Sequence, residues 1–108
     1  MAKVTAGREQ LGDFAPKFAQ LNDDVLFGEV WSREDQLSAR ARSIVTVTAM
    51  MASGVLASSL QFHIQNANAC GVTQEEMEEI LTHAAFYVGW PQAWAAFRFA
   101  QEIYKETE

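Results

Sequence analysis

The three-residue connection from Gly71 to Thr73 constrains this chain more than any other feature of its sequence. Apolar residues recur at helical spacing on both sides of it, which predicts a helix before and after. Gly71 readily takes the left-handed conformation that ends a helix, and Thr73 with Glu76 has the spacing of a capping box that begins the next one. Because so short a turn sends the chain back on itself, the sequence predicts an antiparallel helix hairpin.

The rest of the chain also has a helical pattern, because it shows no strand alternation, internal repeat or low-complexity linker. Its 108 residues predict one all-α domain over residues 1–108, a compact bundle of about six helices with the hairpin at its centre. The expected elements are a short helix over 8–14, a helix over 16–30 that begins at Pro16, a loop over 31–37, a helix capped by Ser38 and closed by Gly54, a helix over 56–70, a helix after Thr73, and a last amphipathic helix after a break at Gly89, Trp90 and Pro91.

The net charge and composition limit the kinds of molecule that this protein is expected to bind and the place where it is expected to work. A formal net charge of −6 argues against nucleic acid and against an anionic membrane surface, because both require clustered positive charge. The single Cys70 cannot form an internal disulfide, and residues 1–13 lack the apolar run of a signal peptide, so we expect a cytoplasmic protein. The uncharged stretch 43–62 is as long as a membrane span, but its polar residues and Gly54 predict two buried helices instead.

Two histidines, His63 and His83, fall on apolar stripes of the two hairpin helices, and we expect both to point inward. A buried imidazole needs partners for its nitrogens, and because imidazoles in general titrate near neutral pH it can be acid, base or ligand, or it can simply complete the core. The stripes are Leu56, Leu60, His63, Ile64 and Ala67 on the first helix, and Ile80, His83, Ala84 and Tyr87 on the second.

Three of the few basic residues, Arg33, Arg40 and Arg42, crowd one loop and the helix start after it. Cations are disfavoured near the positive end of a helix dipole, so we expect anionic groups to compensate them. One explanation is a set of ion pairs, and the other is that an arginine offers its planar fork to a carboxylate substrate. The acidic partners expected for the ion pairs are Glu29, Glu34 and Asp35.

Three further features of the sequence bear on a possible acid–base, thiol or metal-binding role. Glu29 lies beside Trp31, an apolar neighbour that could desolvate the carboxylate for acid or base use; the alternative is an ordinary surface glutamate. Cys70 has no second cysteine near it, so its expected role is packing. No helix carries a His-x-x-x-His or Glu-x-x-His pair, so we expect no metal centre.

Several segments of the chain stand in a specific order: Glu29-Val-Trp31-Ser-Arg33, Leu37-Ser-Ala-Arg40-Ala-Arg42-Ser-Ile-Val-Thr46, His63, Gly71-Val-Thr73-Gln-Glu75-Glu76 and Tyr87-Val-Gly89-Trp-Pro91. In that order and spacing they resemble the carboxymuconolactone decarboxylase family, and the match covers nearly the whole chain after Pro16. The resemblance implies an all-helical, alkylhydroperoxidase D-like fold. It also implies a buried site at a subunit interface and a homo-oligomer that is often a trimer or hexamer.

The same superfamily includes alkylhydroperoxidase D-like proteins, whose redox motif is Cys-x-x-Cys-x-x-x-His. His63 matches the histidine of that motif, but Leu56 and Ser59 occupy the two cysteine places. No thiol can therefore attack a peroxide there, and no resolving disulfide can form. A peroxidase is accordingly the least favoured function.

For the decarboxylase branch, the resemblance implies loss of carbon dioxide from a small carboxylated lactone of aromatic-acid breakdown, with no cofactor. Such a site must hold carboxylates, stabilise the developing enolate and protonate a carbon. The roles implied are carboxylate binding by Arg42 or Arg40, hydrogen-bond donation by Arg33 or Tyr87, and proton transfer by His63 with Glu29, with Trp31 and His83 as further substrate-binding candidates.

An alternative of another class is a non-enzymatic helical oligomer that binds a small ligand or a protein partner, with histidines that only complete the core. Both hypotheses share an oligomer. With 49% hydrophobic residues, so short a chain would otherwise expose a large apolar patch.

Overall fold

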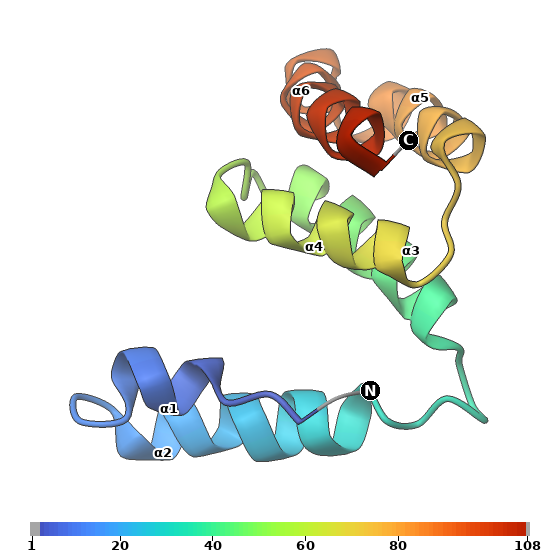
Figure 1. Cartoon of the computed structure of the whole chain (residues 1–108). Helices are drawn as coiled ribbons and strands as arrows, with labels where there is room; N and C mark the ends of the chain where they lie inside the picture. Colours follow the sequence, from blue (N-terminus) through green and yellow to red (C-terminus); the bar gives the residue numbers. More distant parts are fainter. Residues whose placement is uncertain (1–2, 108) are drawn as a thin grey trace. The chain divides into compact units, whose positions relative to one another are not determined.

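Every regular element of this computed structural model, which describes residues 3–107, is helical (Figure 1). This confirms the predicted all-α class; residues 1–2 and 108 of the predicted domain lie outside the described range. The chain divides into two compact units, residues 1–39 (unit 1) and 40–108 (unit 2), which are described in turn. The elements are α1 (Ala6–Leu11), α2 (Pro16–Gln20), η1 (Leu21–Val30), α3 (Ala39–Ala52), α4 (Ser58–Ala69), α5 (Gln74–Val88) and α6 (Trp90–Thr107).

Two neighbouring carboxylates of η1, Asp23 and Asp24, tie α1 to η1 in unit 1. Asp23, in the first turn of η1, accepts hydrogen bonds from the backbone N–H groups of Gly7 at 2.8 Å and Arg8 at 3.0 Å, and so ties α1 to η1. Gly7 is required there, because a Cβ would lie 2.7 Å from Oδ1 of Asp23. The guanidinium of Arg8 also binds both carboxylate oxygens of Asp24, at 2.8 and 2.7 Å.

The predicted helix over 16–30 is present as a continuous helical segment, but its winding changes at Leu21. From there to Val30 the backbone is a π-helix, and the N–H of Trp31 still reaches back five residues to Leu26 O at 3.0 Å. The predicted helix is therefore confirmed, with α winding over Pro16–Gln20 and π winding over Leu21–Val30. Apolar spacing distinguishes helix from strand, but over ten residues it does not separate π from α winding.

Burial alone would raise the pKa of Asp23, but the hydrogen bonds from Asn22, Arg8 and Gly7 and the charge of Arg8 outweigh it and hold the pKa below its usual value. A lowered folded-state pKa stabilises the fold above the unfolded pKa, about 4, and this stabilisation is lost as the pH falls through the folded value. We expect the amide NMR shifts of Gly7 and Arg8 to move on acidification below about pH 4. Asp23→Asn should already show the displaced shifts at pH 7, and unchanged shifts in this variant would contradict the assigned tie.

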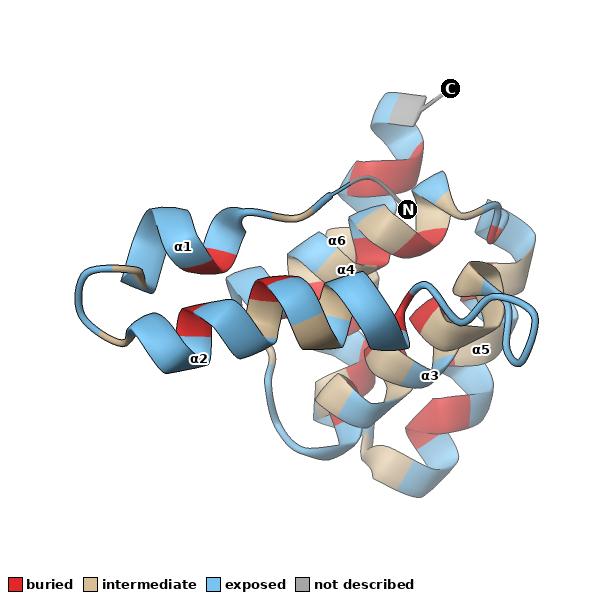
Figure 2. Ribbon diagram, turned by 90° about the horizontal axis from the view of Figure 1, so that it is seen from below, coloured by how far each residue is buried: buried red, intermediate tan, exposed pale blue. Residues whose placement is uncertain are grey.

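In unit 2, α6 packs against both α4 and α5, and α3 adds Val47 and Met51 to the same core (Figure 2). The predicted turn between α4 and α5 is confirmed. Gly71 has φ +96°, and both halves of the capping box between Thr73 and Glu76 form, at 3.1 and 3.0 Å. The fully buried apolar side chains of this core are Val47, Met51, Leu60, Ile64, Ala67, Val72, Met77, Leu81 and Ala96.

Three of the predicted helix boundaries differ from those in the structure. The first short helix covers residues 6–11, and the one expected over 56–70 begins at Ser58. Trp90 and Pro91 lie in the first turn of α6, so the break before it is Gly89 alone, since proline is tolerated in the first turn of a helix. The uncharged stretch 43–62 is split between α3 and α4, and of the helices within residues 3–107 none has the length and apolarity needed to cross a bilayer.

Candidate active site

His63 lies in the second turn of α4, next to the side of that helix that is buried by Leu60, Ile64 and Ala67. Its ring is half-buried and meets the ring of Phe62 edge-on, with centroids 5.0 Å apart. Burial lowers the pKa of His63 below its usual value, because removal from water disfavours the charged form. The imidazole is therefore neutral at pH 7.

His83 does not point inward as predicted, because it is exposed on α5. The core takes a neighbouring stripe of that helix, made by Met77, Leu81 and Ala84, so the stripe through His83 and Tyr87 lies beside the core. The two rings are 5.2 Å apart and line a hollow of about 410 Å³ together with Ile44 and Thr48 of α3. His63 is not part of its lining.

Arg40 forms an ion pair with Glu76, which joins the start of α3 to the start of α5. The expected partners were Glu29, Glu34 and Asp35, and for Arg40 that expectation is wrong. Hydrogen bonding to the Thr73 backbone, with a further bond from Arg40, holds the pKa of Glu76 below its usual value. Glu76 therefore both completes the capping box and neutralises the positive charge of Arg40.

Arg42 is half-buried two residues further along α3, and its carbonyl accepts a hydrogen bond from Thr46 Oγ1 at 2.9 Å. The guanidinium of Arg40 is paired with Glu76. Val45 on the same helix is 59% exposed, so α3 is not buried on all its sides.

The other candidates lie in unit 1. Glu29 is exposed near the end of η1, whereas Trp31 is buried and stacks on Phe27 with ring centroids 6.1 Å apart. The expected desolvation of Glu29 by Trp31 is not seen, because the indole ring packs against Phe27. Arg33 is exposed in the connection before α3, where its backbone N–H donates to the backbone carbonyl of Val30 at 3.2 Å.

Two residues of unit 2 were missed by the sequence reasoning. Glu76 was read only as a capping residue, although its capping box was the available signal. Asn66 follows His63 by three residues, so both lie on one side of α4. The Asn66 side-chain nitrogen is buried and has no hydrogen-bond partner within the described part of the chain, and its oxygen lies 3.9 Å from Cys70 Sγ. A buried donor of this kind can hold an anionic oxygen.

The described residues include no cluster of three or more His, Cys, Asp and Glu side chains arranged to hold a metal ion. The polar groups present are instead suited to binding a carboxylate and to moving a proton, with arginine, amide and imidazole in separate roles.

Comparison with known proteins gives one family and two relatives. The sequence model of the carboxymuconolactone decarboxylase family matches residues 16–102. The chain is 34% identical over 103 residues to the 4-carboxymuconolactone decarboxylase of Acinetobacter baylyi, covering 95% of this chain and 75% of that protein. It is 30% identical over 86 residues to an uncharacterized 15.0 kDa protein of Paracoccus denitrificans, covering 79% of this chain and 63% of that protein.

Proposed function

Since the chain belongs to the carboxymuconolactone decarboxylase family, we propose that it is a cofactor-free lyase that decarboxylates a small carboxylated lactone of aromatic-acid breakdown. The observation that carries the proposal is His63, a half-buried and neutral imidazole held on a helix of the matched region. A cofactor is unnecessary, because the lactone ring and its carbonyl can accept the electron pair that carbon dioxide leaves behind.

The reaction breaks one carbon–carbon bond and requires one proton. As carbon dioxide departs, its bonding electrons pass into the lactone and form an enolate, which is then protonated on carbon. An anionic substrate beside His63 favours the imidazolium, so on substrate binding His63 takes up a proton from solvent, which it then donates to the enolate carbon. His63 is the proposed acid, and Glu29 remains a proposed catalytic residue.

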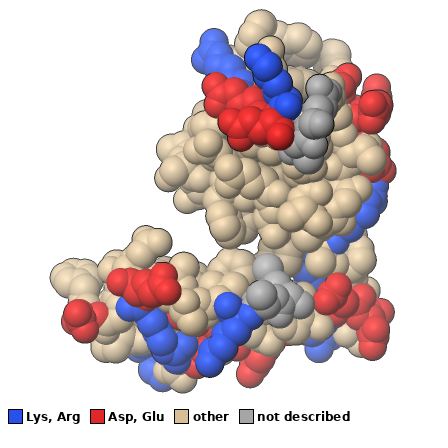
Figure 3. Space-filling model, in the orientation of Figure 1, with Lys and Arg blue, Asp and Glu red and all other residues tan. Residues whose placement is uncertain are grey.

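Arg42 is the proposed carboxylate-binding residue, with Arg40, which is paired with Glu76, as the alternative. The Asn66 amide is the proposed donor to the enolate oxygen, and Arg33, Trp31, Tyr87 and His83 remain proposed substrate contacts. Exposed aromatic side chains support a homo-oligomer, proposed as a trimer or hexamer, and Figure 3 shows a broad stretch of unit 2 without charged side chains. The most exposed of these aromatics in unit 2 are Phe86, Tyr87, Trp90 and Trp94.

The purified protein should release carbon dioxide from 4-carboxymuconolactone without added metal or coenzyme. Arg42→Met should raise KM about tenfold or more, because a charge-assisted bond to the carboxylate is lost. Arg98→Met is the matched control, since Arg98 is exposed over the ring of Trp94, and it should leave KM unchanged. Saturable lactone binding without turnover would instead favour the non-enzymatic ligand-binding protein.

A further inference from the structure

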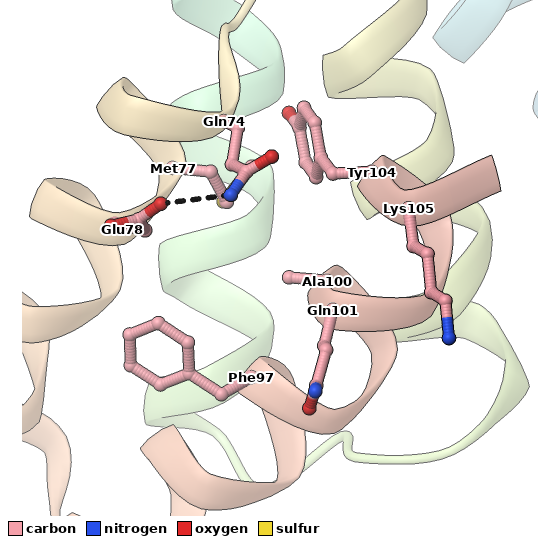
Figure 4. A pocket seen from close by; sticks show the side chains of 8 residues that line it. All are labelled: Gln74, Met77, Glu78, Phe97, Ala100, Gln101, Tyr104 and Lys105. Atoms are coloured by element: carbon pink, nitrogen blue, oxygen red, sulfur yellow. Dashed lines mark hydrogen bonds between the residues drawn. The ribbon is translucent and has the colours of Figure 1, made fainter. Parts of the chain in front are cut away.

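A hollow of about 480 Å³ lies between α5 and α6, apart from the residues that the proposed reaction uses (Figure 4). We propose that it is a second binding site, for a neutral aromatic molecule that carries an N–H or O–H donor. Its volume lies in the range of small-molecule pockets, roughly 300–1,000 Å³. None of His63, Arg42 and Asn66 lines it, so this inference does not depend on the proposed decarboxylation.

The floor of the hollow is apolar and is made by both helices. Met77 comes from α5, and Phe97, Ala100 and Tyr104 follow one another along one side of α6. Because Ala100 carries only a methyl group, the surface of α6 is recessed between the two larger aromatic side chains (Figure 4). Thioether sulfur and aromatic rings both favour contact with a further aromatic ring. The floor therefore fits a flat aromatic ligand.

The rim that α5 contributes offers hydrogen-bond acceptors. Gln74 Nε2 donates to the Glu78 carboxylate at 3.2 Å. The side-chain amide oxygen of Gln74 points across the opening of the hollow toward α6 (Figure 4). The Tyr104 hydroxyl already donates to Val72 O at 2.7 Å. The Gln74 oxygen and the Glu78 carboxylate keep acceptor capacity, so the ligand has to supply the donor.

The charges at the mouth favour a neutral ligand. Glu78 is the acidic lining residue and Lys105 the basic one. Figure 4 shows the Lys105 ammonium directed away from Met77 and Tyr104. A ligand carboxylate on the floor would therefore lie near Glu78 without a facing cation, which costs free energy.

The test uses 2-naphthol as the probe and 2-methoxynaphthalene as the analogue that lacks the donor. The binding of each compound to the full chain is measured by amide NMR titration. We expect saturable shifts on α5 and α6, with binding about tenfold weaker for the methoxy compound. Gln74→Met should weaken this preference, because one of the two rim acceptors is lost, whereas Gln65→Met, the same change at an exposed position of α4, should preserve it. Ala100→Leu fills the recess and should abolish binding of both compounds.

The proposal would be overturned if the two compounds bind with equal affinity or if neither binds saturably. It would also be overturned if 2-naphthol still binds with unchanged affinity to both Gln74→Met and Ala100→Leu. Self-association that perturbs α5 and α6 and is weakened by Ala100→Leu would also overturn it, because a second copy of the chain would then occupy the hollow. If circular dichroism shows that Ala100→Leu is unfolded, Gln74→Met decides the question alone, since it alters only the rim.

Discussion

Replacing His63 with glutamine is expected to lower the proposed decarboxylation about 10²-fold or more while leaving the proposed oligomer and the melting temperature nearly unchanged. Glutamine keeps a polar side chain of similar reach but cannot carry a proton between pH 5 and 8. Gln65→Ala, on the exposed side of the same helix, should change neither quantity. Carbon dioxide release and thermal unfolding are to be measured on the same preparations.

The pH dependence gives a second signature of His63. Burial lowers its pKa, so its contribution to folding stability is present above the unfolded value, about 6.5, and is lost as the pH falls through the folded value. His63→Gln should remove this acid-side loss together with the activity. A folded variant with unimpaired turnover would exclude His63 from the mechanism, and a loss of a few kcal/mol of stability would assign it to the core.

Tyr104→Phe is expected to lower the free energy of unfolding of unit 2 by about 1–3 kcal/mol, because the buried Val72 carbonyl loses the donor 2.7 Å away. Tyr87→Phe is the matched control. That hydroxyl is on a side chain 80% exposed, and its removal should have little effect. Chemical denaturation of both variants at pH 7 measures the difference, and equal stability would contradict a role for the Tyr104 hydrogen bond.

Alkaline titration checks the same bond. Burial, with the nearby charge of Glu76, raises the pKa of Tyr104 to about 12. A phenol whose folded-state pKa is raised stabilises the fold fully below the unfolded pKa, about 10, and this stabilisation is lost as the pH rises toward the folded value. The wild-type protein should therefore lose stability between pH 10 and 12 more steeply than Tyr104→Phe.

The sequence predicted the features that depend on neighbouring residues. The turn at Gly71, the capping box at Thr73 and the start of a helix at Pro16 all depend on side chains within four positions of one another. The contact of Arg40 with Glu76 joins positions 36 apart, and no local pattern selects that partner over nearer acids. His83 was misplaced because α5 has two adjacent apolar stripes, and packing against α6 chose the one through Met77 and Leu81.

The winding of η1 and the buried amide of Asn66 escaped prediction for a different reason. Both are settled by small differences in backbone geometry and side-chain rotamer, which hydrophobic periodicity does not encode. The family match over residues 16–102 identified the chemistry to expect, and the burial of His63 supplied a physical reason for it. The ion pair of Arg40 with Glu76 was likewise not predicted from the sequence.

The short connections in unit 2 limit how this protein can evolve. Gly89 alone separates α5 from α6, and the turn around Gly71 is almost as tight, so a lengthened loop at either place would disturb the packing of α4 and α5 against α6. New substrate preferences would then arise by exchanging side chains on helix surfaces. The segment 31–38, which carries Trp31 and Arg33, is the longest stretch without a helix between η1 and α6, and it is where insertions among descendants of this gene would be tolerated best.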